Sequence, residues 1–193
     1  MTLFIDACAR EGSRTRRLAR CLLEKLGGPV TELRLGELEL PKTDEAFLRR
    51  RDALIAERRF DHPDFALARQ FAGAETIVIA APYWDLSFPA ALKQYFEQIN
   101  VVGVSFDYTP EGVPVGSCRA KRLFYVTTAG GTYVPEEFGF GYVRVLAQNY
   151  YGIRDVRKIE AVGLDLFGAD VDAIMKSAEA ALSDIDPDHQ AAL

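Results

Sequence analysis

Short apolar runs and helical patterns alternate along the chain and predict strands and helices in turn. Apolar or alternating runs predict strands at residues 2–8, 30–35, 76–81, 122–128 and 156–163. Apolar residues at three- and four-residue spacing predict helices at about 14–26, 44–59, 88–99, 138–151 and 169–183, with a shorter helix ending near Gly73. Strands that alternate with helices are typical of a mostly parallel sheet covered on both faces.

The composition of these strands predicts their order in the sheet. The runs at 76–81 and 122–128 are apolar, as buried central strands are, whereas 30–35 and 156–163 carry charges that suit an edge. This distribution matches the order 2-1-3-4-5 of an α/β, flavodoxin-like fold with a five-stranded parallel sheet and helices on both faces. Residues 1–193 have the length of one domain.

Two stretches depart from the alternation of strands and helices. Residues 100–120 contain several glycines and prolines, which break regular elements. An excursion of about 20 residues inside a compact domain is more often functional than idle. The tail from Asp184 to Leu193 has no clear pattern and is expected to fray.

Composition and charge exclude several classes of protein. A net charge of -5 argues against a general nucleic-acid binder. No apolar run has the length of a membrane span, and no signal-peptide pattern precedes the first strand. Cys8, Cys21 and Cys118 are odd in number and widely spaced, which fits free thiols in a reducing cytosol better than disulfides or a metal site. We therefore expect a cytoplasmic protein with neither a nucleic-acid nor a membrane partner.

Unusual loops follow the strands at 2–8, 76–81 and 122–128, and in a parallel sheet they emerge at the same carboxyl edge, where ligands bind. The first loop places Ser13 and Thr15 at a helix start, where free N–H groups and the helix dipole attract anions. Arg10 and Arg14 add positive charge. The alternative is that Ser13 only caps the helix. No GxxxxGK[ST] or GxGxxG pattern indicates a triphosphate or dinucleotide site.

The second loop carries Tyr83 beside Trp84, the single tryptophan of the chain. A planar heterocycle can pack against such rings, although an apolar plug beneath the following helix is the commoner fate of an aromatic pair. Asp85 is expected to cap that helix, with Pro89 in its first turn, in preference to contacting a ligand.

The third loop, Thr128-Ala129-Gly130-Gly131-Thr132-Tyr133, contains two adjacent glycines. Glycine suits a positive φ or a close approach to the backbone. A plain tight turn needs only one glycine, so the pair favours a ligand.

Together these motifs resemble the flavodoxin-like NAD(P)H-dependent quinone reductases and FMN-dependent azoreductases, along most of the chain. The stretches that carry the likeness are Ser13–Thr15, Ala81–Lys93, Gly103–Thr109 and Thr127–Gly131. The resemblance implies that the first loop holds the phosphate of FMN, the second contacts the isoalloxazine and the third lies at its pyrimidine edge. The candidate cofactor-binding residues are Arg10, Ser13, Arg14, Thr15, Pro82, Tyr83, Trp84, Asp85, Leu86, Thr128, Ala129, Gly130, Gly131 and Tyr133.

The same resemblance implies a homodimer in which each subunit places its 100–120 segment over the partner's site. The candidate substrate-pocket residues are Phe106, Tyr108 and Tyr150. Phe106, Tyr108 and Val113 would be left exposed in a monomer, which favours a dimer independently.

The function that the resemblance implies is transfer of hydride from NAD(P)H, through tightly bound FMN, to a quinone, an azo compound or a similar small acceptor. Because the cofactor carries this chemistry, no catalytic side chain and no metal are expected, and neither His62 nor His189 lies in a promising position. A flavodoxin-type electron carrier and a flavin-free regulatory protein of the same fold remain as alternatives. The choice between NADH and NADPH and the natural acceptor stay open.

Some residues depart from the family or invite another interpretation. Ala7 replaces a serine found in many relatives and removes one phosphate contact, and residues 36–75 match the family poorly. The arginines at 14, 16, 17 and 20 suggest a polyanion surface, but a solvated helix face with Arg14 near the phosphate is the favoured interpretation. Cys8 is expected to be a buried strand residue.

Overall fold

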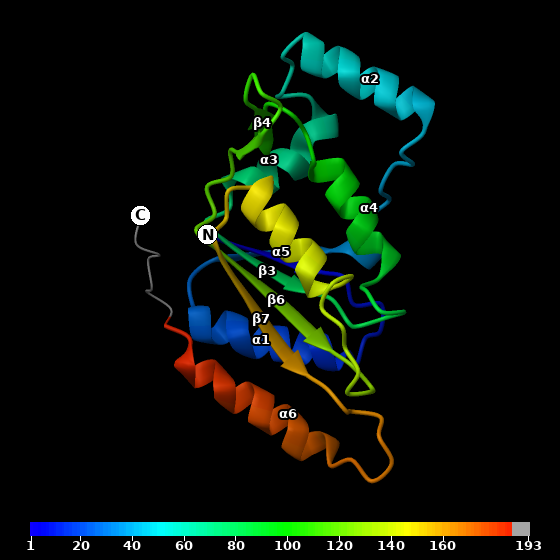
Figure 1. The fold of residues 1–193 in the computed structure, drawn as a ribbon, viewed down its shortest axis with the longest axis vertical. Helices are drawn as coiled ribbons and strands as arrows, with labels where there is room; N and C mark the ends of the chain where they lie inside the picture. The colour runs from blue at the N-terminus through cyan, green and yellow to red at the C-terminus, as the bar shows by residue number, and fades with distance from the viewer. Residues whose placement is uncertain (187–193) are drawn as a thin grey trace.

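The computed structural model describes residues 1–186, and a parallel five-stranded sheet forms its centre (Figure 1). The strand order is β2-β1-β3-β6-β7. The strands span Val30–Arg34 (β2), Thr2–Asp6 (β1), Thr76–Ala80 (β3), Arg122–Thr128 (β6) and Asp155–Ala161 (β7). The predicted order 2-1-3-4-5 is confirmed, since β6 and β7 are the predicted fourth and fifth strands. The two charged strands lie at the edges, as expected.

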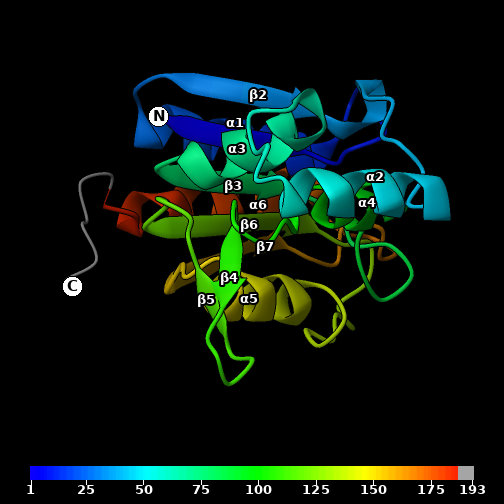
Figure 2. The same cartoon turned by 90° about the horizontal axis from the view of Figure 1, so that it is seen from above.

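Helices cover both faces of the sheet (Figures 1 and 2). On one face lie α1 (Arg14–Leu26) and α6 (Val171–Ala180); on the other lie α3 (Ala66–Gly73), α4 (Ala90–Ile99) and α5 (Phe140–Asn149). The helix α2 (Glu45–Ala56) lies outside this second layer, and short 3-10 turns span Leu35–Glu37 (η1), Pro63–Phe65 (η2) and Ala181–Asp184 (η3). None of the helices in residues 1–186 is long and apolar enough to cross a membrane.

Side chains of β1 show how the sequence builds both cores at once. Successive residues of a strand point to opposite faces, so Leu3 and Ile5 pack under α3, α4 and α5 while Phe4 packs under α1 and α6. All three are fully buried. A strand that is apolar on both faces must therefore be covered on both, which explains the layered architecture.

The parallel ladder continues past the strand ends, which is the feature that positions the site. Ala7 N–H donates to the Ala80 carbonyl at 2.9 Å and Ala81 N–H donates to the Val126 carbonyl at 2.9 Å. Beyond these, Tyr83 N–H donates to the Thr128 carbonyl at 3.0 Å. The loops after β1, β3 and β6 consequently leave the carboxyl edge of the sheet next to one another.

The predicted 100–120 excursion is a small antiparallel hairpin of β4 (Phe106–Tyr108) and β5 (Pro114–Gly116). The many breakers limit each strand to three residues. A second difference concerns α4, which begins at Ala90 because Pro89, at ψ 141°, is still extended. The predicted frayed tail lies mostly outside the described residues, although Ile185 is buried against the α1 face.

The hairpin is fixed by contact between two backbone segments. A Cβ on Gly116 would lie 2.1 Å from the Gly152 nitrogen and 2.1 Å from the Tyr151 carbonyl carbon. Neither backbone atom can move aside as a flexible side chain would. Gly116 is therefore required by the close approach of β5 to the end of α5.

We expect Gly116→Ala to lower the free energy of unfolding by about 3 kcal/mol or more, because overpacking here meets backbone. Gly36→Ala is the matched control, since a Cβ there meets nothing within 4 Å. Urea unfolding of both variants measures the difference. Equal stability of the two variants would contradict the close approach.

Candidate functional site

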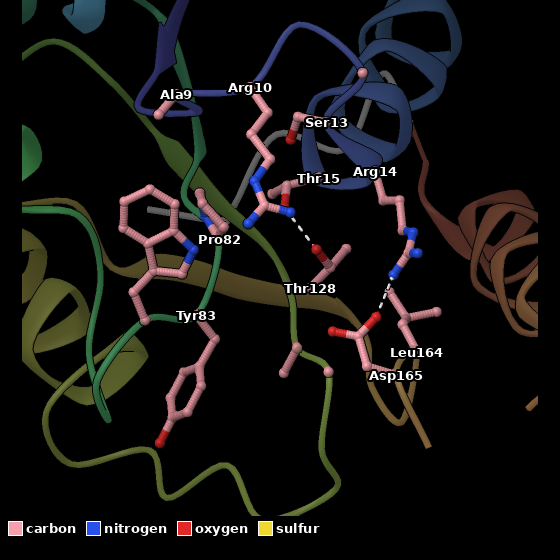
Figure 3. A pocket seen from close by; sticks show the side chains of 14 residues that line it. Ala9, Arg10, Ser13, Arg14, Thr15, Pro82, Tyr83, Thr128, Leu164 and Asp165 are labelled. Carbon is pink, nitrogen blue, oxygen red and sulfur yellow. Dashed lines mark hydrogen bonds and ion pairs between the residues drawn. The ribbon is translucent and has the colours of Figure 1, made fainter. Parts of the chain in front are cut away.

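A cavity of ≈ 290 Å³ opens at the carboxyl edge of the sheet, where the loops after β1, β3, β6 and β7 meet (Figure 3). Its size is at the lower end of the range of small-molecule sites. The lining residues are Ala9, Arg10, Gly12, Ser13, Arg14, Thr15, Pro82, Tyr83, Trp84, Thr128, Ala129, Gly130, Leu164 and Asp165. All three loops selected from the sequence therefore contribute to one cavity.

The start of α1 forms one end of the cavity. Ser13 is the N-cap, and its hydroxyl accepts from Arg16 N–H at 3.3 Å. The capping interpretation is thus correct, yet Ser13 also lines the cavity. The first-turn N–H groups of Arg14 and Thr15 have no acceptor among residues 1–186. Free donors at a helix N-terminus suit an anion.

Charged side chains stand around this end of the cavity. Arg14 Nη1 donates to Asp165 Oδ1 at 2.9 Å, which joins α1 to the loop after β7. The Arg10 side chain has no hydrogen-bond or ion-pair partner in the part of the chain that the structure describes, and it extends into the cavity (Figure 3). The two arginines and the one aspartate leave this end with an excess of positive charge.

Two buried hydroxyls connect the first and third loops. Thr15 Oγ1 and Thr128 Oγ1 lie 2.7 Å apart, so one donates and the other accepts (Figure 3). Thr15 is only 1% exposed. Loss of either hydroxyl would leave the other buried without a partner, which costs about 1–3 kcal/mol.

The aromatic loop turns sharply through Asp85 and Leu86. Trp84 N–H donates to the Ser87 carbonyl at 3.1 Å, and Ser87 N–H donates to the Trp84 carbonyl at 2.8 Å. Asp85 (φ 50°) and Leu86 (φ 67°) both have positive φ. A two-residue turn with both central residues at positive φ is the type I′ geometry, which normally selects Asn and Gly.

This turn corrects the expectation for Asp85. Its side chain does not cap α4, which lacks a side-chain cap, because the turn and Pro89 separate Asp85 from the helix start. Asp85 and Leu86 do not line the cavity either.

Trp84 is 41% exposed and is not an apolar plug beneath α4. Burial raises the pKa of the Tyr83 hydroxyl, which points away from Arg10 and Ser13.

The two glycines of the third loop have different roles. A Cβ on Gly130 would lie 2.4 Å from Asp165 Oδ2, so this glycine makes room for the carboxylate. The Gly131 carbonyl accepts from Gly163 N–H at 3.0 Å, and Gly131 does not line the cavity. Neither has a positive φ. The sequence predicted that a ligand would approach this loop closely. At Gly130 the group that approaches is instead Asp165, from the loop after β7.

Four lining residues were not predicted from the sequence: Ala9, Gly12, Leu164 and Asp165. The last two belong to the loop after β7. Asp165 N–H donates to the Gly130 carbonyl at 2.9 Å and Leu164 N–H donates to the Ala129 carbonyl at 3.2 Å. The position of this loop after an edge strand of the same sheet was the available signal.

Tyr133 and the predicted substrate-pocket residues do not line the cavity. Tyr133 is 79% exposed. Phe106 packs edge-on against Tyr108 and Tyr150, with ring centroids 5.4 and 4.7 Å apart. This cluster lies at the end of α5 that is remote from the carboxyl ends of the strands (Figure 1). The expectation that Phe106 would be exposed in a monomer is wrong, since it is 4% exposed, whereas Tyr108 and Val113 are exposed.

The arginine cluster of α1 is committed to carboxylates. Arg14, Arg16, Arg17 and Arg20 form ion pairs with Asp165, Asp6, Glu179 and Glu32, respectively. Ion pairs of this kind neutralise the surface that a polyanion would need. The favoured interpretation of a solvated face fits Arg17, whereas the Arg16 side chain is largely buried. Cys8 is buried, as expected, and burial raises the pKa of its thiol to about 12.

Comparison with known proteins shows to which family the chain belongs. Residues 1–185 match the model of a family described as having a flavodoxin-like fold. The chain belongs to this family. An FMN-dependent NADH:quinone oxidoreductase of Clostridium beijerinckii is 38% identical over 185 residues, covering 91% of this chain and 92% of that protein. A second such enzyme, from Clostridium acetobutylicum, is 36% identical over 186 residues, with 91% and 92% covered.

Two solved azoreductase structures have the same fold. An azoreductase from Bacillus anthracis has a TM-score of 0.81 at 24% identity, covering 94% of this chain and 96% of that one. An FMN-dependent NADH-azoreductase from the same species, in complex with FMN, has a TM-score of 0.74 at 22% identity, covering 94% and 97%. At these identities the likeness concerns the fold.

The residues of the cavity fit FMN on their own chemistry. A phosphate needs cations and free N–H donors, which the α1 end and Arg10 supply. A flavin ring needs a flat apolar wall, which Pro82, Tyr83 and Trp84 supply at the other end. The two ends lie on one cavity.

We expect Leu86→Gly to leave stability unchanged within about 0.5 kcal/mol or to raise it by up to about 1 kcal/mol, because glycine removes the strain of a positive φ. Leu48→Gly is the control, an exposed leucine in α2, and should cost about 1 kcal/mol or more. Urea unfolding compares the two. Equal losses would show that the turn is unstrained.

Proposed function

We propose that this protein is an FMN-dependent NADH oxidoreductase that reduces quinones or azo compounds. One observation carries the proposal: one cavity joins a helix start with free N–H donors, and Arg10, which has no side-chain partner among residues 1–186, to an aromatic wall. The relatives named FMN-dependent NADH:quinone oxidoreductase, which span nearly the whole chain, support the cofactor and the reductant. We further infer that residues 1–193 act as one domain.

The proposed division of labour follows the two ends of the cavity. Ser13, Arg14 and Thr15, with Arg10, would hold the phosphate through N–H groups, hydroxyls and guanidinium groups. Pro82, Tyr83 and Trp84 would hold the ring, and Thr128, Ala129 and Gly130 would approach its polar edge. Bound FMN supplies the hydride-transfer chemistry. The protein then supplies orientation, positive charge and exclusion of water.

Asp85, Leu86, Gly131 and Tyr133 stay in the proposed cofactor set with a weaker basis, because none lines the cavity. Asp85 and Leu86 form the turn that holds Trp84, and Gly131 anchors the loop after β7. Their proposed contribution is therefore to the shape of the loops that surround the flavin.

We propose that the functional unit is a homodimer. The hairpin exposes Tyr108, Val113 and Val115, each about half accessible. Apolar side chains grouped on one hairpin favour a protein contact. Because the hairpin lies remote from the cavity of its own chain, Phe106, Tyr108 and Tyr150 could border an acceptor only in the site of a second copy.

A cytoplasmic location is also part of the proposal. Cys8, Cys21 and Cys118 are all free thiols in the structure. Three unpaired cysteines are typical of a reducing compartment.

We expect purified protein soaked with FMN and desalted to stay yellow, and to bleach when mixed anaerobically with NADH. A quinone or an azo dye should then restore the flavin absorbance. Stopped-flow absorbance measures both steps. A bound flavin that NADH does not bleach would instead favour an electron carrier, and a colourless protein would favour a flavin-free role.

We expect light scattering to give a mass near twice 21.4 kDa. Val115→Glu should shift this mass toward the monomer and slow acceptor reduction, because a charge cannot be buried in an apolar contact. Val30→Glu, at an exposed site on the edge strand β2, is the control and should leave the mass unchanged. A monomeric wild-type protein would remove the dimer proposal.

A further inference from the structure

The guanidinium group of Arg16 is surrounded by acceptors from the loop between β1 and α1. Nη1 donates to the carbonyls of Arg10 and Glu11 at 2.8 and 2.9 Å, and Nη2 donates to the Cys8 carbonyl at 2.8 Å. Nε donates to Asp6 Oδ2. The planar fork of an arginine can satisfy several acceptors at once in this way, which a lysine cannot.

Asp6 completes the arrangement at the end of β1. Its side chain is fully buried, and its Oδ1 accepts from Cys8 N–H at 2.9 Å. The carboxylate therefore balances the charge of Arg16 and fixes Cys8, the second residue after β1. Since the pair is neutral as a unit, its effect on the cavity comes through the conformation of the loop.

That conformation determines where the N–H groups of the loop point. A trans peptide directs its C=O and N–H to opposite sides, and no cis peptide occurs in residues 1–186. Because Arg16 holds the carbonyls of Cys8, Arg10 and Glu11, the N–H groups of Ala9, Glu11 and Gly12 point away from it.

These N–H groups continue the donors of the helix start. Within the described residues, no acceptor is present for the backbone N–H groups of residues 9–15. Ala9 and Gly12 line the cavity, as do Ser13, Arg14 and Thr15. Successive N–H groups that face a concavity form an anion-binding nest.

We propose that Arg16 is a positioning residue: it turns the carbonyls of Cys8, Arg10 and Glu11 away from the cavity. In this way it presents the N–H groups of the residues that follow them, Ala9, Glu11 and Gly12, to the phosphate of the cofactor. The inference rests on the proposed function and explains how the phosphate end is preorganised. Preorganised donors avoid the cost of ordering the loop when the ligand binds.

The test compares two flavins that differ only in the phosphate. The main variant is the double substitution Asp6→Asn with Arg16→Gln, which avoids leaving a buried charge unpaired, an error that costs about 3–5 kcal/mol. The control is Arg17→Gln with Glu179→Gln, which removes the neighbouring α1 ion pair outside the cavity. Dissociation constants for FMN and riboflavin are measured by fluorescence titration.

We expect the main variant to bind FMN about 10-fold more weakly or worse, as a loss of about 1.4 kcal/mol or more, with riboflavin affinity unchanged and the control unaffected. Equal weakening for both flavins would make Arg16 a general structural residue and overturn the inference. Unchanged FMN affinity would also overturn it.

A second variant covers a failure of the double variant to fold. Arg16→Lys keeps the charge beside Asp6 but cannot reach the three carbonyls together, so it should also lose preference for FMN over riboflavin. A lysine variant with the wild-type preference would contradict the proposal. A wild-type protein that binds both flavins equally would overturn this inference alone, whereas one that binds neither would remove the proposed function as well.

Discussion

The register of the parallel ladder is the constraint on which the site depends. Asp6, Ala80 and Val126 are paired across β1, β3 and β6, and the ladder then continues from Ala7 to Ala80 and from Ala81 to Val126. The loops therefore leave the sheet side by side. A shift by one residue would reverse the faces of the side chains and would separate Thr15 from Thr128.

Ion pairing divides the arginines of the first loop and of α1 into those neutralised by carboxylates and one that stays available to a ligand. Arg16, Arg17 and Arg20 are held by carboxylates outside the cavity, and Arg14 is shared with Asp165 at its rim. Arg10 keeps its charge available. An acidic chain thus presents a local positive site without a basic surface, which explains how a net charge of -5 is compatible with an anionic ligand.

The sequence was sufficient for features that depend on local pattern. The apolar runs predicted the strands and their order, and the three loops followed because a parallel sheet brings them to one edge. No local sequence pattern marked Asp165 as a cavity residue. It reaches the cavity because the loop after β7 pairs with the loop after β6 at Gly130. Asp85 was misjudged because nothing in its neighbours indicated a positive φ. The burial of Phe106 depends on Tyr150, a contact between distant parts of the chain.

The helix α5 connects the hairpin to the aromatic loop. At one end, Gly116 lies against the backbone of Tyr151 and Gly152. At the other, the Phe138 carbonyl accepts from the Ser87 hydroxyl at 2.6 Å. A ten-residue helix is about 15 Å long. The two contacts therefore link the hairpin on the outer surface to the turn behind Trp84 through a single helix, so the position of one constrains the position of the other.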